Sequence, residues 1–135
     1  MLERFVEGRD IAVSVVDLEE GPIALPPVEV STDDGHYDYE ARYTTDESEY
    51  FVPARLSNDE MTDVQAAAIQ IHELLGLRDL SRIDFIVDDN GSFWFIDANV
   101  SPGMTDTSLF PQAAEATGSF DEICAAIVRY VASRD

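Results

Sequence analysis

The stretch from Arg82 to Met104 constrains the fold of this chain more than any other. Two alternating apolar runs, Ile83–Val87 and Phe93–Ile96, lie on either side of Asn90-Gly91, a dipeptide typical of a type I′ hairpin turn. Side chains of a β-strand alternate between the two faces of a sheet, so these runs fit two half-buried strands. The sequence therefore predicts an antiparallel β-hairpin with a two-residue turn.

The predicted hairpin brings acidic side chains together on one of its faces. With the turn placed there, Asp84 is expected directly opposite Asp97, and Arg82 opposite Asn99. The same face is expected to continue with the pair Ile86–Phe95. The other face is expected in the core, with the pairs Ile83–Ala98, Phe85–Ile96 and Val87–Trp94.

Two carboxylates directly opposite each other across a ladder repel, and a bound cation would relieve that repulsion. Hard divalent cations take oxygen ligands, and Mg²⁺ typically uses one or two carboxylates together with substrate phosphates. Asn99 adds an oxygen on the face of Asp84 and Asp97, and the planar guanidinium of Arg82 suits a phosphate or a developing oxyanion. The alternative is that Asp84 and Asp97 belong to the solvated face of a hairpin in a very acidic protein.

The charge balance of the chain is extreme, with 28 acidic and 8 basic side chains and a net charge of −20. All the basic residues are arginine. Such a surface repels nucleic acids and anionic membranes, so both are excluded as partners. Because an acid-rich, lysine-free composition resembles that of proteins from salt-accumulating cells, we expect a halophilic source, with a high-GC bacterium as the alternative.

The remaining composition fits one soluble globular domain. The chain has 135 residues, 45% of them hydrophobic, which is enough for one core. It contains no apolar run of about 18 residues and no signal-peptide pattern at Met1, so a cytoplasmic protein is expected. Its only cysteine, Cys124, excludes an intrachain disulfide and a cysteine zinc site and is expected in the core.

The first strands are predicted near the N-terminus. Ile11–Val16 predicts one strand, and the runs Ile23–Leu25 and Val28–Val30 predict a second that returns antiparallel. Pro26-Pro27 interrupts the second strand, which is expected to be irregular or on an edge. Residues 31–55 predict a long loop with short strands. Because the chain begins on a strand with almost no lead-in, we expect a piece of a longer protein.

Caps and apolar periodicity predict three helices. The capping box Ser57–Glu60 begins a helix over Asn58–Leu75, and a short helix is predicted over Phe110–Thr117. A second capping box, Ser119–Glu122, begins a final helix that ends near Ser133. The core-facing residues are expected to be Val64, Ala68, Ile71 and Leu75 in the first helix and Ile123, Ile127 and Val131 in the last.

The order strand, strand, loop, helix, hairpin, helix, helix predicts an α+β fold. We expect an antiparallel sheet with the helices packed on one face. No internal repeat or linker divides the sequence, so residues 1–135 are expected to form a single domain.

Several motifs resemble those of a known enzyme family. The pattern Arg82-x-Asp84, a turn, Asp97-x-Asn99 and then Ser-Pro-Gly-Met-Thr is similar to the C-terminal part of D-alanine–D-alanine ligases, which belong to the ATP-grasp superfamily. Further matches extend the resemblance over nearly the whole chain. They are Ser108-Leu109 and Pro111 downstream, and Glu7–Asp10, Tyr37–Tyr43 and Phe51–Ala54 upstream.

The resemblance implies a site for two Mg²⁺ (or Mn²⁺) ions in the C-terminal ATP-grasp domain. It puts Asp84, Asp97 and Asn99 at the metals, with Asp97 one methylene shorter than the family's usual glutamate. Arg82 would stabilise charge on the transferred phosphoryl group and on the tetrahedral intermediate. The backbone N–H of Gly103 would point at the oxyanion, although this glycine without its neighbours would predict only a turn.

The resemblance also implies positions for the substrates. Asp10 matches the acid that binds the ribose hydroxyls of ATP, Arg42 stands where the family has a lysine on the ATP phosphates, and Tyr43 is placed near the substrates. Ser108 and Leu109 match the pair that receives the carboxylate of the second D-alanine through a hydroxyl and a backbone N–H. The sequence alone also fits an ordinary surface acid at Asp10 and a helix cap at Ser108.

The implied function is the ATP-dependent joining of two D-alanines through an acyl phosphate. The family's enzymes are more than twice as long, so we expect that the N-terminal domain and the nucleotide lid are absent and that the chain alone is inactive. The alternatives are another ATP-grasp carboxylate–amine ligase and a non-enzymatic acidic domain that binds cations diffusely. The sequence leaves open which amino acids are joined. It also leaves open whether the full-length enzyme is a homodimer and whether it acts in peptidoglycan synthesis.

Overall fold

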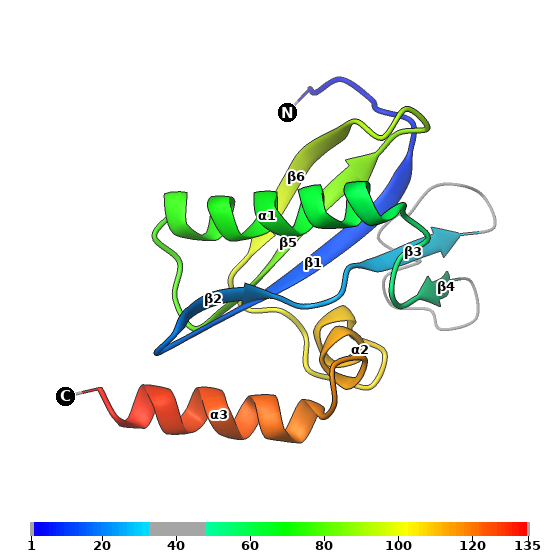
Figure 1. Cartoon of the computed structure of the whole chain (residues 1–135). Helices are drawn as coiled ribbons and strands as arrows, with labels where there is room; N and C mark the ends of the chain where they lie inside the picture. Colours follow the sequence, from blue (N-terminus) through cyan, green and yellow to red (C-terminus); the bar gives the residue numbers. More distant parts are fainter. Residues whose placement is uncertain (1, 33–47, 135) are drawn as a thin grey trace.

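The structure is a computed structural model that describes residues 2–32 and 48–134. Within these residues it contains a six-stranded antiparallel sheet and three helices (Figure 1). In chain order the elements are β1 (Arg9–Leu18), β2 (Gly21–Ala24), β3 (Val28–Thr32), β4 (Ser48–Phe51), α1 (Asn58–Leu74), β5 (Leu80–Val87), β6 (Phe93–Asn99), α2 (Leu109–Glu115) and α3 (Phe120–Ala132).

β1 is the strand on which the sheet is built. It pairs with β5 along one edge and with β2 and β3 along the other, in the order β4-β3-β1-β5-β6 with β2 also on β1. The predicted returning strand is confirmed, and it is split into β2 and β3 around Pro26-Pro27. Proline causes this break because it has no N–H to donate to the ladder.

Helices cover both faces of the sheet, so the prediction that they pack on one face is wrong. The odd-numbered residues of Ile11–Val16 form one core with Val64 and Ala68 of α1. The even-numbered apolar residues of the same run pack on the other face, with Phe110 of α2 and Ile127 of α3. A continuous apolar run is typical of a strand that is buried on both faces. The α+β class and the antiparallel sheet are confirmed.

The turn between β5 and β6 contains residues 89–91, one more than predicted. The Asp88 N–H donates to the Ser92 carbonyl at 2.9 Å, and the Gly91 N–H donates to the Asp88 carbonyl at 3.1 Å. Gly91 has a φ of +79°, the left-handed conformation that follows a type I turn in three-residue hairpin loops. The Asp88 carboxylate accepts hydrogen bonds from the backbone N–H groups of Asn90 and Ser92, which stabilises this turn.

The predicted register is correct at the acidic pair and wrong near the turn. Asp84 pairs with Asp97, and Arg82 pairs with Asn99. The register shifts just after Asp84, which leaves Ile96 as an extra residue in a β-bulge. This bulge offsets the longer turn. In place of the predicted Phe85–Ile96, Ile86–Phe95 and Val87–Trp94, the structure has Phe85–Phe95, Ile86–Trp94 and Val87–Phe93.

β6 is an edge strand, and its apolar side chains are largely exposed. Trp94 and Ile96, which the sequence places in the core, expose 36% and 48% of their surfaces. The buried half of the hairpin is β5, whose Ile83, Phe85 and Val87 are almost completely buried. β6 differs because it pairs only with β5 and has no strand on its outer side within the described sheet.

α1 begins at the predicted capping box. The Ser57 hydroxyl accepts a hydrogen bond from the Glu60 N–H at 3.2 Å, and the Glu60 carboxylate accepts one from the Ser57 N–H at 2.7 Å. Leu75, predicted on the buried stripe, is 54% exposed because it lies at the C-cap, after the last helical turn. The buried residues of the helix are Val64, Ala68 and His72.

α2 and α3 form a helical pair beside β1 and β3. α2 begins one residue earlier than predicted, and α3 begins with the Ser119 hydroxyl accepting from the Glu122 N–H at 3.3 Å. Ile127 is buried and Ile123 is partly buried in the core on this side. Val131, also predicted in the core, is 43% exposed because it lies in the last turn, beyond the residues that form this core.

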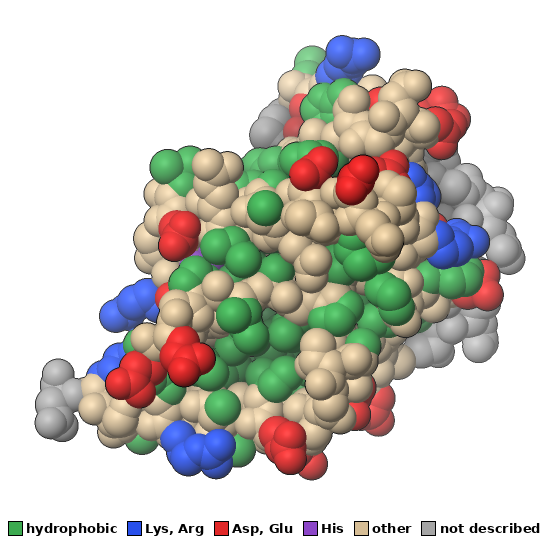
Figure 2. All heavy atoms as spheres, in the orientation of Figure 1, with side chains coloured by type: hydrophobic (Ala, Val, Ile, Leu, Met, Phe, Trp, Pro, Cys, Tyr) green, Lys and Arg blue, Asp and Glu red, His purple; other side chains and the backbone are tan. Residues whose placement is uncertain are grey.

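One hollow of the surface is apolar in its centre and has charged side chains around it. Figure 2 shows the hollow with a green floor and both red and blue side chains nearby. It lies between β2 and α3, and its lining residues include Leu18, Ile23 and Ala126, together with the charged Glu19, Glu20 and Arg129. No helix within the described ranges is long and apolar enough to cross a bilayer.

Cys124 lies on α3 and is half-buried. Burial, with a smaller contribution from the negative charge of Asp121, raises the pKa of its thiol. The thiol therefore stays protonated at neutral pH, which does not favour a role as a nucleophile. The predicted core position is only partly correct, because Cys124 is half-buried and belongs to neither core cluster.

Candidate functional site

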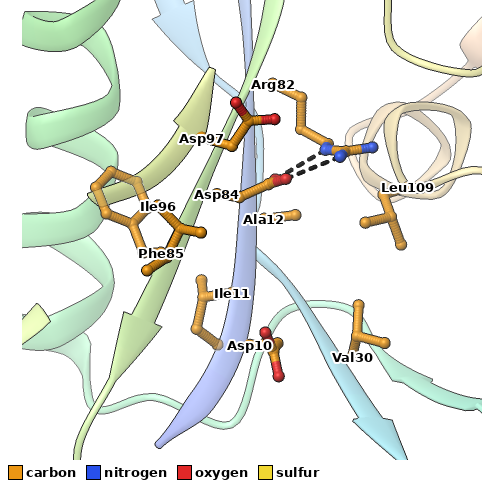
Figure 3. A pocket seen from close by; sticks show the side chains of 10 residues that line it. All are labelled: Asp10, Ile11, Ala12, Val30, Arg82, Asp84, Phe85, Ile96, Asp97 and Leu109. Carbon is orange, nitrogen blue, oxygen red and sulfur yellow. Dashed lines mark hydrogen bonds and ion pairs between the residues drawn. The ribbon is translucent and has the colours of Figure 1, made fainter. Parts of the chain in front are cut away.

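A pocket opens on the α2 side of the sheet, around the predicted acidic pair (Figure 3). Strands β1, β3, β5 and β6 and the start of α2 all contribute to it. Both charged and apolar side chains line it. The lining residues are Asp10, Ile11, Ala12, Val30, Arg82, Asp84, Phe85, Ile96, Asp97 and Leu109.

Arg82 and Asp84 form a bidentate ion pair on one face of β5. They lie two residues apart in the strand, so both side chains point into the pocket. The Arg82 Nε and Nη2 atoms donate to the two Asp84 carboxylate oxygens, each at 2.8 Å. Their side chains are only 13% and 19% exposed, so the pair is shielded from solvent and fixes the plane of the guanidinium.

Asp97 lies directly opposite Asp84 but has a different environment. It is exposed, and no described residue donates a hydrogen bond to its carboxylate. Hard divalent cations prefer such oxygens, so this donor set fits a cation that touches both strands. Within the described residues, no cluster of three or more His, Cys, Asp and Glu side chains could hold a metal. A cation here would therefore need amide or substrate oxygens as further ligands.

Asn99 lies opposite Arg82 at the end of β6. Its side-chain carbonyl accepts a hydrogen bond from the Ser101 N–H at 2.9 Å, which begins the turn toward α2. An amide oxygen has two lone pairs, so this bond leaves one for a further partner. Asn99 does not line the pocket itself, although ladder parity places it on the same sheet face as Asp97.

Asp10 approaches the pocket from β1. It pairs with Ile86 on β5 and Val30 on β3, two residues along β1 from Ala12, the direct partner of Asp84. The alternation of side chains therefore puts the Asp10 and Asp84 carboxylates on one face, as Figure 3 shows. Asp10 is half-buried rather than the freely exposed acid of the alternative interpretation.

Gly103, Ser108 and Leu109 follow β6 as one compact segment. A Cβ atom on Gly103 would lie 2.5 Å from the Ser108 Oγ, so a larger residue here would force this hydroxyl to move. Ser108 occupies the N-cap position of α2, but its side chain makes no capping hydrogen bond and binds Thr105 instead. Leu109 is 6% exposed and lines the pocket.

The predicted site is thus partly assembled in the structure. The pocket brings together Asp10, Arg82, Asp84, Asp97 and Leu109. Asn99 at the end of β6, and Gly103 and Ser108 on the segment that follows it, lie outside its lining. Arg42 and Tyr43 lie outside the described residues, so their predicted roles stay predictions.

One buried carboxylate was missed by the sequence reasoning. Glu29 on β3 is 1% exposed and accepts hydrogen bonds from the backbone N–H of Arg55 at 2.9 Å and from its Nη2 at 2.6 Å. Burial alone would raise the pKa of Glu29, but the side-chain and backbone hydrogen bonds from Arg55 outweigh it and lower the pKa. The only signal in the sequence is a glutamate between Val28 and Val30, inside an apolar strand.

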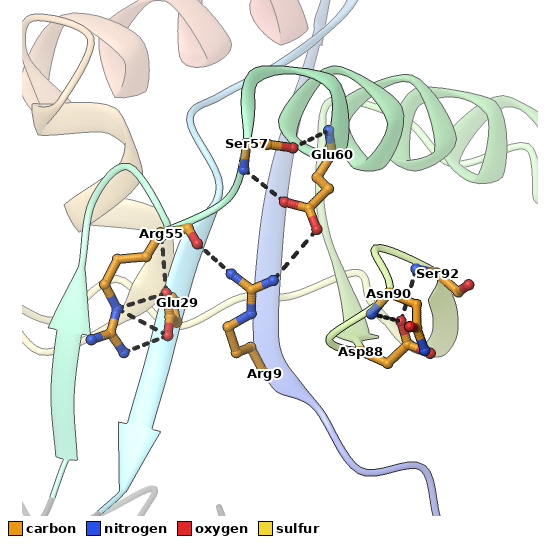
Figure 4. A network of polar contacts seen from close by, with 8 residues as sticks. All are labelled: Arg9, Glu29, Arg55, Ser57, Glu60, Asp88, Asn90 and Ser92. Carbon is orange, nitrogen blue, oxygen red and sulfur yellow. Dashed lines mark hydrogen bonds and ion pairs between the residues drawn. The ribbon is translucent and has the colours of Figure 1, made fainter.

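The Glu29–Arg55 pair belongs to a larger polar network (Figure 4). Arg9 at the start of β1 donates to the Arg55 carbonyl and forms an ion pair with Glu60 at 3.5 Å. The Arg55 guanidinium also stacks 3.6 Å above the ring centroid of Phe51. The network joins β1, β3, β4 and the N-terminus of α1, and thereby fixes the strand that carries Asp10.

A second buried polar group lies far from the pocket. His72 on α1 is 1% exposed, and its Nδ1 lies 2.8 Å from the Oγ of Ser81, which is also fully buried. Its Nε2 lies 3.5 Å from an Asp17 oxygen and has no hydrogen bond among the described residues. The His72–Ser81 hydrogen bond ties the end of α1 to β5.

The whole chain has clear relatives in sequence. A family model described as D-ala D-ala ligase C-terminus matches residues 1–129. A D-alanine–D-alanine ligase of Nitrosospira multiformis is 39% identical over 124 residues, which cover 91% of this chain and 39% of that protein. A D-alanine–D-alanine ligase of Bordetella petrii is 39% identical over 135 residues, which cover 99% of this chain and 41% of that protein.

Solved structures of ligases are also similar to this chain. The VanG D-Ala:D-Ser ligase from Enterococcus faecalis matches with a TM-score of 0.81 and 26% identity over 95% of this chain and 37% of that chain. A D-alanine–D-alanine ligase from Bacillus anthracis complexed with ATP matches with a TM-score of 0.75 and 26% identity. The match covers 95% of this chain and 41% of that chain. The chain thus spans about two fifths of the length of these proteins. It belongs to the family of C-terminal domains of D-alanine–D-alanine ligases.

Proposed function

We propose that the chain forms the C-terminal part of the active site of an ATP-dependent ligase that joins two D-alanines through an acyl phosphate. The observation that carries this proposal is the pocket in which the Arg82–Asp84 pair faces Asp97, with Asp10 on the same side of the sheet. Family membership supports the reaction class. The chain alone is proposed to lack ligase activity, because it spans only two fifths of its relatives.

Asp84, Asp97 and Asn99 are proposed to hold two Mg²⁺ or Mn²⁺ ions. The support is chemical: two opposed carboxylates and an amide oxygen form a hard donor set, and Asp97 has no donor among the described residues. When bound, such ions would neutralise and orient the phosphate oxygens of the nucleotide.

Arg82 is proposed to stabilise negative charge on the transferred phosphoryl group and on the tetrahedral intermediate. Both Asp84 oxygens bind its guanidinium, so its orientation is set before the substrates arrive. Charge fixed in advance costs no reorganisation during the reaction. The Gly103 N–H is proposed to support the same oxyanion.

The substrates are proposed to bind on the same face. Asp10 would accept hydrogen bonds from the ribose hydroxyls of ATP, Arg42 would contact its phosphates, and Tyr43 would lie near the amino acids. Ser108 and Leu109 would receive the carboxylate of the second D-alanine. In support, one similar solved structure is that of a ligase complexed with ATP.

A Mn²⁺ titration of this chain, followed by amide NMR in high KCl, tests the metal site. Paramagnetic broadening by Mn²⁺ should affect mainly the amide signals of Asp84, Asp97 and Asn99. It should be lost in the variant Asp97→Asn. Asp89→Asn is the matched control, because Asp89 is an exposed acid in the hairpin turn. Broadening spread over the acidic surface and equally weakened by both variants would favour the non-enzymatic domain that binds cations diffusely.

A second candidate is a ligase with a different second amino acid. The observation that favours it is the similarity to a D-Ala:D-Ser ligase, with a TM-score of 0.81. Comparing D-alanine and D-serine as the second amino acid, in a full-length ligase that carries this domain, separates the two candidates. A preference for D-serine would replace the D-alanine proposal.

The setting of the enzyme is also a proposal. We place it in the cytoplasm and in the synthesis of peptidoglycan precursors, with a homodimeric full-length protein. The net charge of −20 supports adaptation to high salt. Sedimentation of the full-length ligase at several concentrations tests the dimer.

A further inference from the structure

The segment between β6 and α2 carries hydroxyl side chains that contact one another. The Thr105 Oγ1 lies 2.8 Å from the Ser108 Oγ and 3.4 Å from the Thr107 Oγ1. The Thr105 N–H donates to the Ser108 Oγ at 3.2 Å, and the Ser108 N–H donates to the Thr105 carbonyl at 2.8 Å. Thr105 and Ser108 are therefore joined by hydrogen bonds of both their backbones and their side chains.

The hydrogen-bond capacity of Ser108 explains what Thr105 can do. A serine hydroxyl has one proton to donate and two lone pairs to accept with. The Thr105 N–H occupies one lone pair. When the Thr105 hydroxyl donates to the other, the Ser108 proton must point to a third group. In that arrangement Thr105 leaves Ser108 with its proton free to donate to a group other than Thr105.

Gly103 lies close to the same hydroxyl. A Cβ atom there would lie 2.5 Å from the Ser108 Oγ and 3.3 Å from its Cβ. The Ser108 side chain is therefore close to both Gly103 and Thr105. Its hydroxyl has little freedom to rotate without losing its contacts to Thr105.

We propose that Thr105 is a positioning residue that orients the Ser108 hydroxyl as a donor to the carboxylate of the second amino acid. This inference rests on the proposed function, in which Ser108 receives that carboxylate. Thr105 acts through Ser108 and does not touch the reacting atoms. A carboxylate accepts hydrogen bonds only, so a hydroxyl with both lone pairs filled is the matching partner.

The test compares Thr105→Val with Thr105→Ser in a full-length ligase that carries this domain. Valine keeps the shape and the backbone N–H but removes the hydroxyl, whereas serine keeps the hydroxyl. We expect Thr105→Val to raise KM for the second amino acid about tenfold, with kcat and the KM for ATP within about twofold. Thr105→Ser should restore the wild-type KM. Thr107→Val is the matched control, since Thr107 contacts Thr105 only at 3.4 Å.

A second measurement uses the 135-residue chain itself. Amide hydrogen exchange at Thr105 should accelerate in Ser108→Ala, because its acceptor is lost. An unchanged exchange rate would overturn the contact on which the inference rests.

The outcomes separate this inference from the proposed function. A wild-type enzyme that joins no amino acids would overturn the proposed function. An active wild type with an unchanged KM in Thr105→Val would overturn only the role of Thr105. Equal damage from Thr105→Val and Thr105→Ser would show that the side chain acts by packing, which also overturns it.

Discussion

Asp84 and Asp97 lie directly opposite each other on β5 and β6, and the Arg82 guanidinium donates to both carboxylate oxygens of Asp84. In the absence of cations, Asp97 adds a second carboxylate charge beside this pair, and like charges directly opposite each other destabilise a ladder. The arrangement also places two hard oxygen donors in the pocket. Binding and catalytic sites often keep arrangements that lower the stability of the protein, because the function requires them.

Replacing Asp97 by Asn should stabilise the metal-free chain. The change removes the repulsion from Asp84 while keeping the size of the side chain, and we expect a gain of about 0.5 kcal/mol. Thermal unfolding in the presence of a chelator measures this gain. Asp89→Asn removes the same charge from the exposed turn and should give a smaller gain. Equal gains would show that only the total charge matters.

Replacing Glu29 by Gln should reduce the stability of the protein at neutral pH. The change removes charged hydrogen bonds to Arg55 at a buried position, which should cost about 1–3 kcal/mol. Urea unfolding at pH 7 measures the loss. Glu20→Gln, at an exposed position, is the control and should change the midpoint little.

Glu29 should also make stability depend on acidity. Its pKa is lower in the folded protein than the ordinary glutamate value, which is about 4.3. The stabilisation is therefore fully present above that ordinary pKa and is lost as the pH falls through the folded-state pKa. Unfolding midpoints measured downward from pH 6 should fall less steeply in Glu29→Gln than in the wild type. Parallel curves would contradict this prediction.

Local signals in the sequence predict local structure well in this chain. The capping hydroxyls of Ser57 and Ser119 are where the pattern puts them, because each depends on residues within one helical turn. The Asp84–Asp97 pair was also predicted, although the turn is longer than expected. It was right because the bulge at Ile96 restores the register that the turn at Gly91 had shifted.

Features that depend on distant residues were not predictable in the same way. The partner of Glu29 is 26 residues away, and nothing in the local pattern names it. The exposure of Trp94 follows from the place of β6 at the edge, which is set by the other strands. The two-sided burial of Ile11–Val16 is the exception, because a run with Ser14 as its single polar residue is typical of a strand covered on both faces.

Replacing Gly103 by Ala should act through Ser108. Among the described residues, only the Ser108 side chain blocks the new methyl group, so its hydroxyl must move and its contact with Thr105 is disturbed. We expect KM for the second amino acid to rise in a full-length ligase, while the melting temperature of the chain changes little. A double-mutant cycle with Ser108→Ala checks the mechanism, because removing the hydroxyl makes room for the methyl group. Additive effects would show that Gly103 acts independently.

Raising the salt concentration should stabilise the chain strongly. The net charge of −20 produces self-repulsion that acts over about 30 Å at 0.01 M salt and about 3 Å at 1 M. Melting temperatures should therefore rise steadily from low to molar KCl. The control is a variant in which exposed acids become their amides, at Glu3, Glu20, Asp63 and Asp89. Because this variant carries less charge, it should melt higher at low salt and gain less from KCl. An equal rise in both proteins would assign the effect to general salt exclusion from the protein surface rather than to charge screening.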